Sequence, residues 1–135
     1  MSPRCLCGLI QTILIVKQIS NLLVTEMAKH DFGIMQAEPK KGQRYDNYNP
    51  EEYNCISVDD DDILPLLEKL RGVKCFWHTL DRPGFGLAYY GITLIPPESF
   101  SAIIEMIWHN PNLSDLMDLL LEAENTKKYV IHFGG

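Results

Sequence analysis

The chain has 135 residues, the size of one domain, and its 46% hydrophobic and 22% charged residues are typical of a globular protein that can bury a core. Its formal net charge of -6 argues against nucleic acid or an anionic membrane surface as the main partner, because both require a concentrated basic face. The same charge is compatible with a basic protein partner, with binding of cations, or merely with solubility.

Residues 1–26 differ from everything that follows them, because they are mostly apolar and carry one Arg, one Lys and one Glu. The apolar run from Cys5 to Val16 follows a basic residue, as in a signal peptide, but no small-residue cleavage site comes after it and it is too short to span a membrane. Three interpretations stay open: a spurious or dispensable extension with Met27 as the true start, an amphipathic helix, and a signal or membrane anchor. A single α+β domain is predicted over 27–135.

Residues 31–36 are predicted to form a short strand, with alternating apolar side chains. The next segment, 38–54, is rich in Pro, Gly, Asn and charge, which is typical of a loop. It also contains three tyrosines, and pure linkers are poor in aromatic residues. We therefore expect this loop to pack on the domain and, because of its length, to carry function.

Residues 55–58 are predicted to form a second strand, followed at once by four aspartates, 59–62, and a helix. The aspartates suit the N-terminus of that helix, where a side-chain oxygen caps free N–H groups and negative charge meets the positive end of the dipole. Pro65 is tolerated only in the first turn, which places the predicted cap near Asp61 or Asp62. An EF-hand would need a different spacing, so capping is favoured over a cation site, and a contact surface for a basic partner is the main alternative.

The stretch 74–95 is predicted to form a hairpin with a type II turn at residues 81–84, Asp-Arg-Pro-Gly. Residues on one strand alternate between the two faces of the sheet. A two- or four-residue loop therefore defines which residues of the two strands share a face, and a three-residue loop with a bulge would exchange this pairing. One set is expected on the open face and the other beneath the helices. The open-face set is Phe76, His78, Leu80, Leu87 and Tyr89, and the second set is Cys75, Trp77, Thr79, Ala88, Tyr90, Ile92 and Leu94.

Two further helices, opened by Pro97 and by Asn112, and a final strand, 129–133, complete the predicted elements. From Cys55 the order β-α-β-β-α-α-β predicts a ferredoxin-like split βαβ fold, an antiparallel sheet with its helices on one face. Its strand order would be 4-1-3-2, with 55–58 and 85–95 in the centre. The strand at 31–36 would be an additional one, at an edge or across the open face.

The cysteines form no Cys-x-x-Cys pair and no zinc-like cluster, and no other cofactor motif is present. Cys55 and Cys75 fall in predicted strands, where free cysteines are usually small buried hydrophobes. We therefore expect a reduced, cytoplasmic protein without metal or cofactor. In the predicted order His78 and His132 lie about 14 Å apart, which is too far for a shared metal ion.

These observations predict a small acidic binding protein, of an inhibitor-, immunity- or regulator-like type, whose partner is another protein or a second copy of itself. The expected site is the open sheet face with the 38–54 loop. An equal alternative is that the loop and the first strand simply cover that face. A rival prediction is a small enzyme or small-molecule-binding domain with its pocket where the loop meets the hairpin. A membrane partner requires residues 1–26 to be a real anchor. The open-face binding residues would be Phe76, His78, Tyr89 and His132, and the rival pocket would be lined by Tyr45, Tyr48, His78, Asp81 and Arg82.

Overall fold

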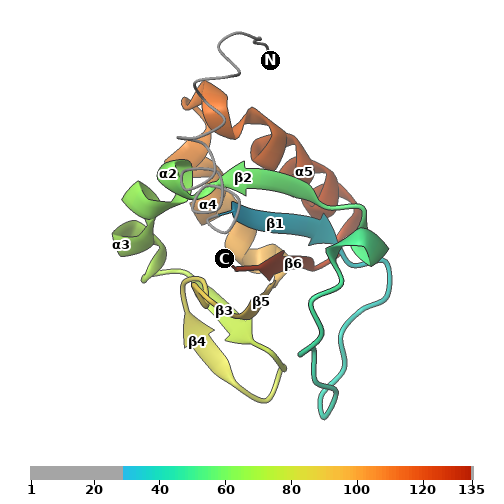
Figure 1. The fold of residues 1–135 in the computed structure, drawn as a ribbon. Coiled ribbons are helices and arrows are strands. Elements are labelled where there is room, and N and C mark those ends of the chain that lie inside the picture. Colours follow the sequence, from blue (N-terminus) through green and yellow to red (C-terminus); the bar gives the residue numbers. More distant parts are fainter. Residues whose placement is uncertain (1–28, 135) are drawn as a thin grey trace, which may run out of the picture.

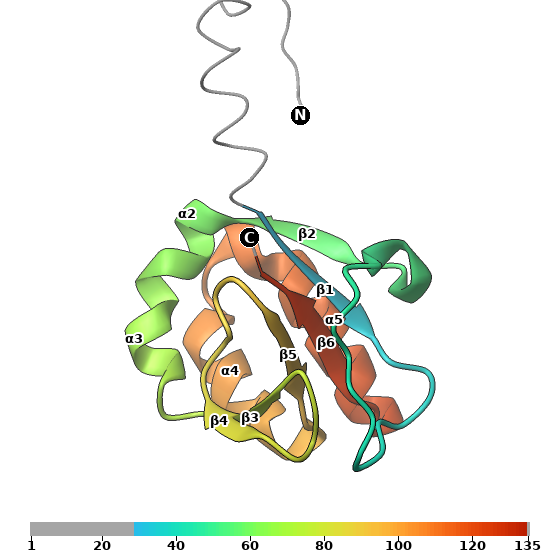
Figure 2. The same ribbon diagram turned by 60° about the horizontal axis from the view of Figure 1, so that its bottom comes forward.

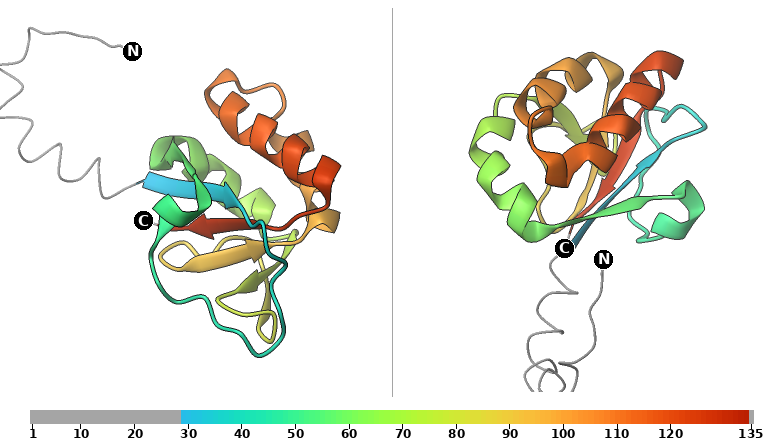
Figure 3. Two further views of the ribbon diagram at one scale, coloured as in Figure 1. Left: turned by 90° about the vertical axis from the view of Figure 1, so that its right-hand side faces the viewer. Right: turned by 90° about the horizontal axis from the view of Figure 1, so that it is seen from above.

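The structure, a computed structural model, describes residues 29–134 and contains one antiparallel sheet over that range. Its strands follow the order β2-β1-β6-β5-β3-β4, and the helices cover one of its faces (Figures 1 and 3). The α+β class is therefore confirmed, while the predicted extension 1–26 lies outside the described residues. The strands are β1 (Lys29–Ile34), β2 (Ile56–Asp59), β3 (Lys74–Trp77), β4 (Pro83–Phe85), β5 (Ile92–Ile95) and β6 (Val130–Phe133).

The helices are α2 (Asp60–Ile63), α3 (Leu67–Leu70), α4 (Phe100–Ile107) and α5 (Ser114–Thr126). Between them and the sheet lies the main core, to which every helix and β1, β2, β3, β5 and β6 contribute apolar side chains. None of the helices in residues 29–134 combines the length and the apolarity that a bilayer crossing requires. The buried side chains of α4 and α5 recur at helical spacing, with Phe100, Ile103 and Ile107 on α4 and Leu116, Leu119, Leu120 and Ala123 on α5.

The run of aspartates does begin a helix, but its N-cap lies two or three residues earlier than predicted. Asp59 occupies the N-cap position of α2, and its side chain makes no capping hydrogen bond. Pro65 lies in a 3-10 turn, Leu64–Leu66, that separates α2 from α3, because proline has no N–H for a regular α-helical bond. The second aspartate, Asp60, is buried, and its side chain forms hydrogen bonds with His30 and Tyr89.

The predicted ferredoxin-like strand order is wrong. That order places 55–58 beside 85–95 as parallel central strands, whereas here β2 is an edge strand and every pair is antiparallel. The position of β1 also differs from its prediction, which placed this strand at an edge or across the open face. It pairs on both sides, so that Phe32 lies opposite Ile56 of β2 and opposite His132 of β6. β6 takes the place beside β5 that was predicted for 55–58, and β1 lies between β6 and β2.

The hairpin also differs from its prediction, since residues 83 and 84 belong to β4 and not to the turn. The turn spans 78–82, closed by Arg82 N–H donating to the Thr79 carbonyl at 3.0 Å. Proline is acceptable at the start of β4 because β4 is an edge strand. An irregular segment with Gly86 at φ 84° then separates β4 from β5, and this breaks the predicted alternation. Leu94 consequently lies opposite Phe76, on the face away from Cys75.

The sheet face away from the helices is not open. A second core forms there from Met35, Ile92, Leu94, Ile131 and Phe133. The long connection between β1 and β2 crosses this face, and Tyr45 and Tyr53 from it pack against the second core (Figure 2). Apolar strand residues on both faces of the sheet are thus buried, and this explains why an otherwise polar loop contains tyrosines.

Candidate functional site

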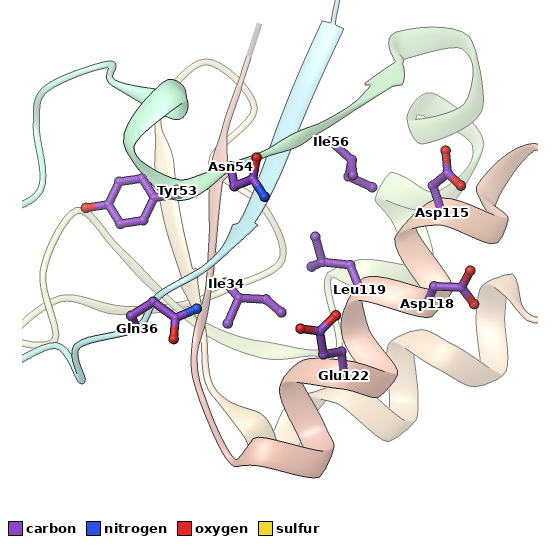
Figure 4. A pocket seen from close by; sticks show the side chains of 9 residues that line it. All are labelled: Ile34, Gln36, Tyr53, Asn54, Ile56, Asp115, Asp118, Leu119 and Glu122. Atoms are coloured by element: carbon purple, nitrogen blue, oxygen red, sulfur yellow. The ribbon is translucent and has the colours of Figure 1, made fainter.

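A groove runs between α5 and the β1–β2 edge of the sheet, with a cavity volume of about 340 Å³ (Figure 4). Its floor is apolar, its α5 wall carries three carboxylates, and its opposite wall is formed by amides and a tyrosine. We call it the acidic groove. Its lining consists of Ile34, Ile56 and Leu119 on the floor, Asp115, Asp118 and Glu122 on α5, and Gln36, Tyr53 and Asn54 opposite.

Helical periodicity puts the three acids in a row. Asp115, Asp118 and Glu122 are three and four residues apart, so they share one side of α5, beside its buried stripe. Within residues 29–134 no Lys or Arg forms an ion pair with any of them. Like charges at these spacings repel one another, so a cation in the groove would relieve that repulsion.

The opposite wall is fixed by a close approach of backbone. The 3-10 turn Pro50–Tyr53 ends at Asn54, whose φ of 52° is in the left-handed region that asparagine tolerates. Gly33 of β1 lies directly beneath this turn, where a Cβ atom would come within 2.7 Å of Tyr53 Cβ and of Cys55 Sγ. Lys128 donates to the Gln36 side chain at one end of the groove.

A second polar feature is buried between α2 and the sheet. His30 Nδ1 lies 2.9 Å from His132 Nε2, and His30 Nε2 lies 2.9 Å from Asp60 Oδ1. Tyr89 donates its hydroxyl to the same carboxylate oxygen at 2.6 Å. Thr93 Oγ1 lies 3.2 Å from His132 Nδ1 and accepts the Ala88 N–H at 2.8 Å. We call these residues the histidine network.

One assignment of protons satisfies the whole histidine network. With both imidazoles neutral, Thr93 donates to His132, His132 donates to His30, and His30 donates to Asp60. Both rings are completely buried, and every ring nitrogen then has a partner. No nitrogen is left to act as a general base, so the arrangement ties β1, β5, β6 and α2 together rather than presenting a reactive group.

Burial and the neighbouring His30 hold the pKa of His132 well below its ordinary value. Burial alone would raise the pKa of Asp60, but hydrogen bonds from Tyr89 and His30 outweigh it and lower the value. The hydrogen bond to that carboxylate in turn raises the pKa of Tyr89 to about 12. At neutral pH Asp60 is therefore charged while His132 and Tyr89 are neutral, which is the state that the hydrogen bonds require.

His78 and Asp81, two of the residues predicted for binding, anchor the 38–54 loop. His78 Nδ1 lies 2.8 Å from an Asp46 carboxylate oxygen and 3.2 Å from the Tyr45 carbonyl, and its Nε2 accepts the Ile92 N–H at 3.4 Å. Asp81 accepts the Gly42 N–H at 2.8 Å. Both ring nitrogens of His78 thus have protein partners, Nδ1 in the 38–54 loop and Nε2 in β5.

The other predicted site residues lie in several places. Phe76 and Tyr45 pack in the second core, whereas Tyr89 and His132 belong to the histidine network on the helix side. The predicted residues therefore do not form one surface. Of the remaining two, Tyr48 donates to the Tyr90 carbonyl at 2.7 Å, and Arg82 lies over the Trp77 ring at 5.9 Å.

A smaller cavity of about 190 Å³ lies beside the 38–54 loop, between Tyr45, Tyr53 and Ile131. His78, Asp81 and Arg82 do not line it, although they were predicted to line a pocket with Tyr45. In the described range, 29–134, no three side chains of metal-binding type converge.

Sequence reasoning missed the acidic groove and the histidine network. The signal for the groove was visible, because acids at 115, 118 and 122 recur at helical spacing beside the buried stripe of α5. No local signal existed for the histidine network, since His30 and His132 are 102 residues apart in sequence. Their contact depends on β1 and β6 pairing.

Comparison with known proteins adds no assignment: no protein-family model matches the chain, and neither a curated protein nor a solved structure shows significant similarity to it.

Proposed function

We propose that the protein is a small acidic interaction module that binds a basic segment of a partner protein in the acidic groove. The observation that carries this proposal is a row of three carboxylates, without basic partners in residues 29–134, above an apolar floor. Binding was also proposed from the sequence, but at the sheet face that the 38–54 loop covers. The acidic groove takes the place of that face, and Tyr53 and Asn54, at the end of the same loop, form part of its wall.

Lysine and arginine side chains fit both the floor and the wall. Their aliphatic stems cover apolar surface while the charged ends reach polar groups, so a stem would lie over Ile34, Ile56 and Leu119. The cation would reach the carboxylates of α5 and form charge-assisted hydrogen bonds. The net charge of -6 would also speed the approach of a basic partner.

The alternative function, an enzyme with a pocket around His78, has weaker support. A general base needs a free ring nitrogen near its substrate, whereas both nitrogens of His78 have protein partners. Arg82 is stacked on Trp77 and does not face a cavity shared with His78.

The proposal predicts that neutralising the α5 wall weakens binding of basic peptides. A fluorescently labelled peptide of alternating Lys and Val is titrated with the full chain and with the double variant Asp118→Asn, Glu122→Gln. Loss of two partly exposed ion pairs should raise Kd about tenfold. Binding should also become less dependent on salt concentration, because fewer charges take part.

The matched control is the double variant Glu98→Gln, Glu105→Gln, which removes the same charge from exposed positions at and before α4. It should leave Kd within about twofold of the unchanged protein, since screening weakens attraction between exposed charges far apart. An equal loss in both double variants would show that total charge alone attracts the peptide. No loss in the α5 variant would exclude the acidic groove as the binding site.

A further inference from the structure

We propose that the basic segment binds as an added strand on β2, with alternate side chains entering the acidic groove. This inference rests on the proposed function and specifies the form of its partner. It follows from the position of β2, which within residues 29–134 pairs with β1 on one side only and forms an edge of the sheet. An edge strand presents backbone N–H and C=O groups that another chain can use.

The faces of β2 determine where the side chains of an added strand would point. Ile56 and Val58 face the helices, and Ile56 lines the acidic groove. Ser57 faces the other way, where it donates to Asp31. Because side chains alternate along a strand, every second residue of a strand beside β2 would project on the helix side. There it meets the wall of α5, which runs past β2 (Figure 4).

The spacing of charges on α5 suits that alternation. Asp118 and Glu122 are four residues apart, which is about 6 Å along a helix axis. Alternate residues of a strand are separated by about 6.6 Å. A Lys-x-Lys pair on the added strand can therefore place one cation near each carboxylate, while a contiguous Lys-Lys pair sends one side chain to the opposite face.

The two edges of the sheet differ in how well they accept another strand. The β4 edge begins with Pro83, which has no N–H to donate. β2 has no proline, and its sequence Ile-Ser-Val-Asp contains two β-branched aliphatic residues. A second copy of this chain is disfavoured as the occupant, because its own Asp59 and acidic groove would face like charges. A basic partner has no such repulsion.

The test uses full-length protein and peptides of one composition, Thr-Lys-Val-Lys-Val-Lys-Thr and the block order Thr-Lys-Lys-Lys-Val-Val-Thr. The alternating peptide should bind about tenfold more tightly. It should also slow backbone hydrogen exchange in residues 56–59, while the block peptide does not. Both effects should be lost in the variant Asp118→Asn, Glu122→Gln.

N-methylation provides a second, more direct measurement. In a strand, the N–H groups of alternate residues point to opposite sides, so methylating the three lysine nitrogens or the two valine nitrogens blocks only one side. We expect one of the two methylated peptides to lose at least tenfold in affinity and the other to change little.

Equal affinities for the alternating and block peptides, with both dependent on Asp118 and Glu122, would overturn strand addition and leave the proposed function intact. Equal effects of the two N-methylations would overturn it as well. If no basic peptide binds in a manner that depends on these carboxylates, the proposed function itself fails.

Discussion

Replacing His132 with alanine is expected to lower the free energy of unfolding by about 3 kcal/mol or more. The side chain is completely buried, and its removal leaves a void beside Phe32 and His30. It also leaves His30 Nδ1 without its donor and Thr93 without an acceptor in a place that water does not reach. Unsatisfied buried groups and the cavity both destabilise the folded state, so the two costs add.

Urea denaturation of the full chain at pH 7.5, followed by tryptophan fluorescence, measures this loss. The control is His109→Ala, because His109 is exposed and its ring contacts Trp108 only at the surface. The control should stay within about 0.5 kcal/mol of the unchanged protein. A loss for His132→Ala no larger than that of the control would show that the histidine network contributes little to stability.

Acid is expected to destabilise the protein as the pH falls below about 6.5, the ordinary pKa of histidine. His132 has its pKa held well below that value in the folded state by burial and by His30. Between the two pKa values the unfolded chain binds a proton that the folded chain does not bind, so the free energy of unfolding decreases as the pH decreases. The slope approaches about 1.4 kcal/mol per pH unit for one such group.

The measurement is the urea midpoint at pH values from 8 to 5, with His132→Ala compared over the same range. Removing His132 should flatten the dependence between pH 6.5 and 5. Asp60 acts in a lower window, because its lowered pKa adds stability that is lost only when the pH falls below about 4. Stability that stays constant or rises from pH 7 to 5 would contradict this assignment.

The histidine network and the acidic groove are connected through β1. His30 and Ile34 lie at opposite ends of this strand, the first in the histidine network and the second on the groove floor. The network fixes β1 against β6 and the start of α2, which directly follows β2. The edge that we propose as a docking site is therefore held by buried hydrogen bonds at one end and by the turn at Tyr53 and Asn54 at the other.

Most elements of secondary structure could be predicted because their signals are local. The stripes of α4 and α5 recur every three or four residues, and the tyrosines of the 38–54 loop indicated packing that Tyr45 and Tyr53 do make. Predicting the faces of the hairpin failed because the turn lies at 78–82 rather than 81–84 and because the chain is irregular between β4 and β5. The irregular segment that begins at Gly86 changes which residues face the helices. The positive φ of Gly86 cannot be recognised from the spacing of the apolar residues.

The sequence by itself determined the α+β class and the helices with their buried faces. These features depend on residues within one or two turns of each other, so the periodicity of the apolar residues is enough to predict them. Only the tertiary structure decided the strand order, because β1 can pair on either side and its residues do not specify their partners. From that choice came the edge position of β2, the contact of His30 with His132 and the acidic groove, which all join segments far apart in the chain.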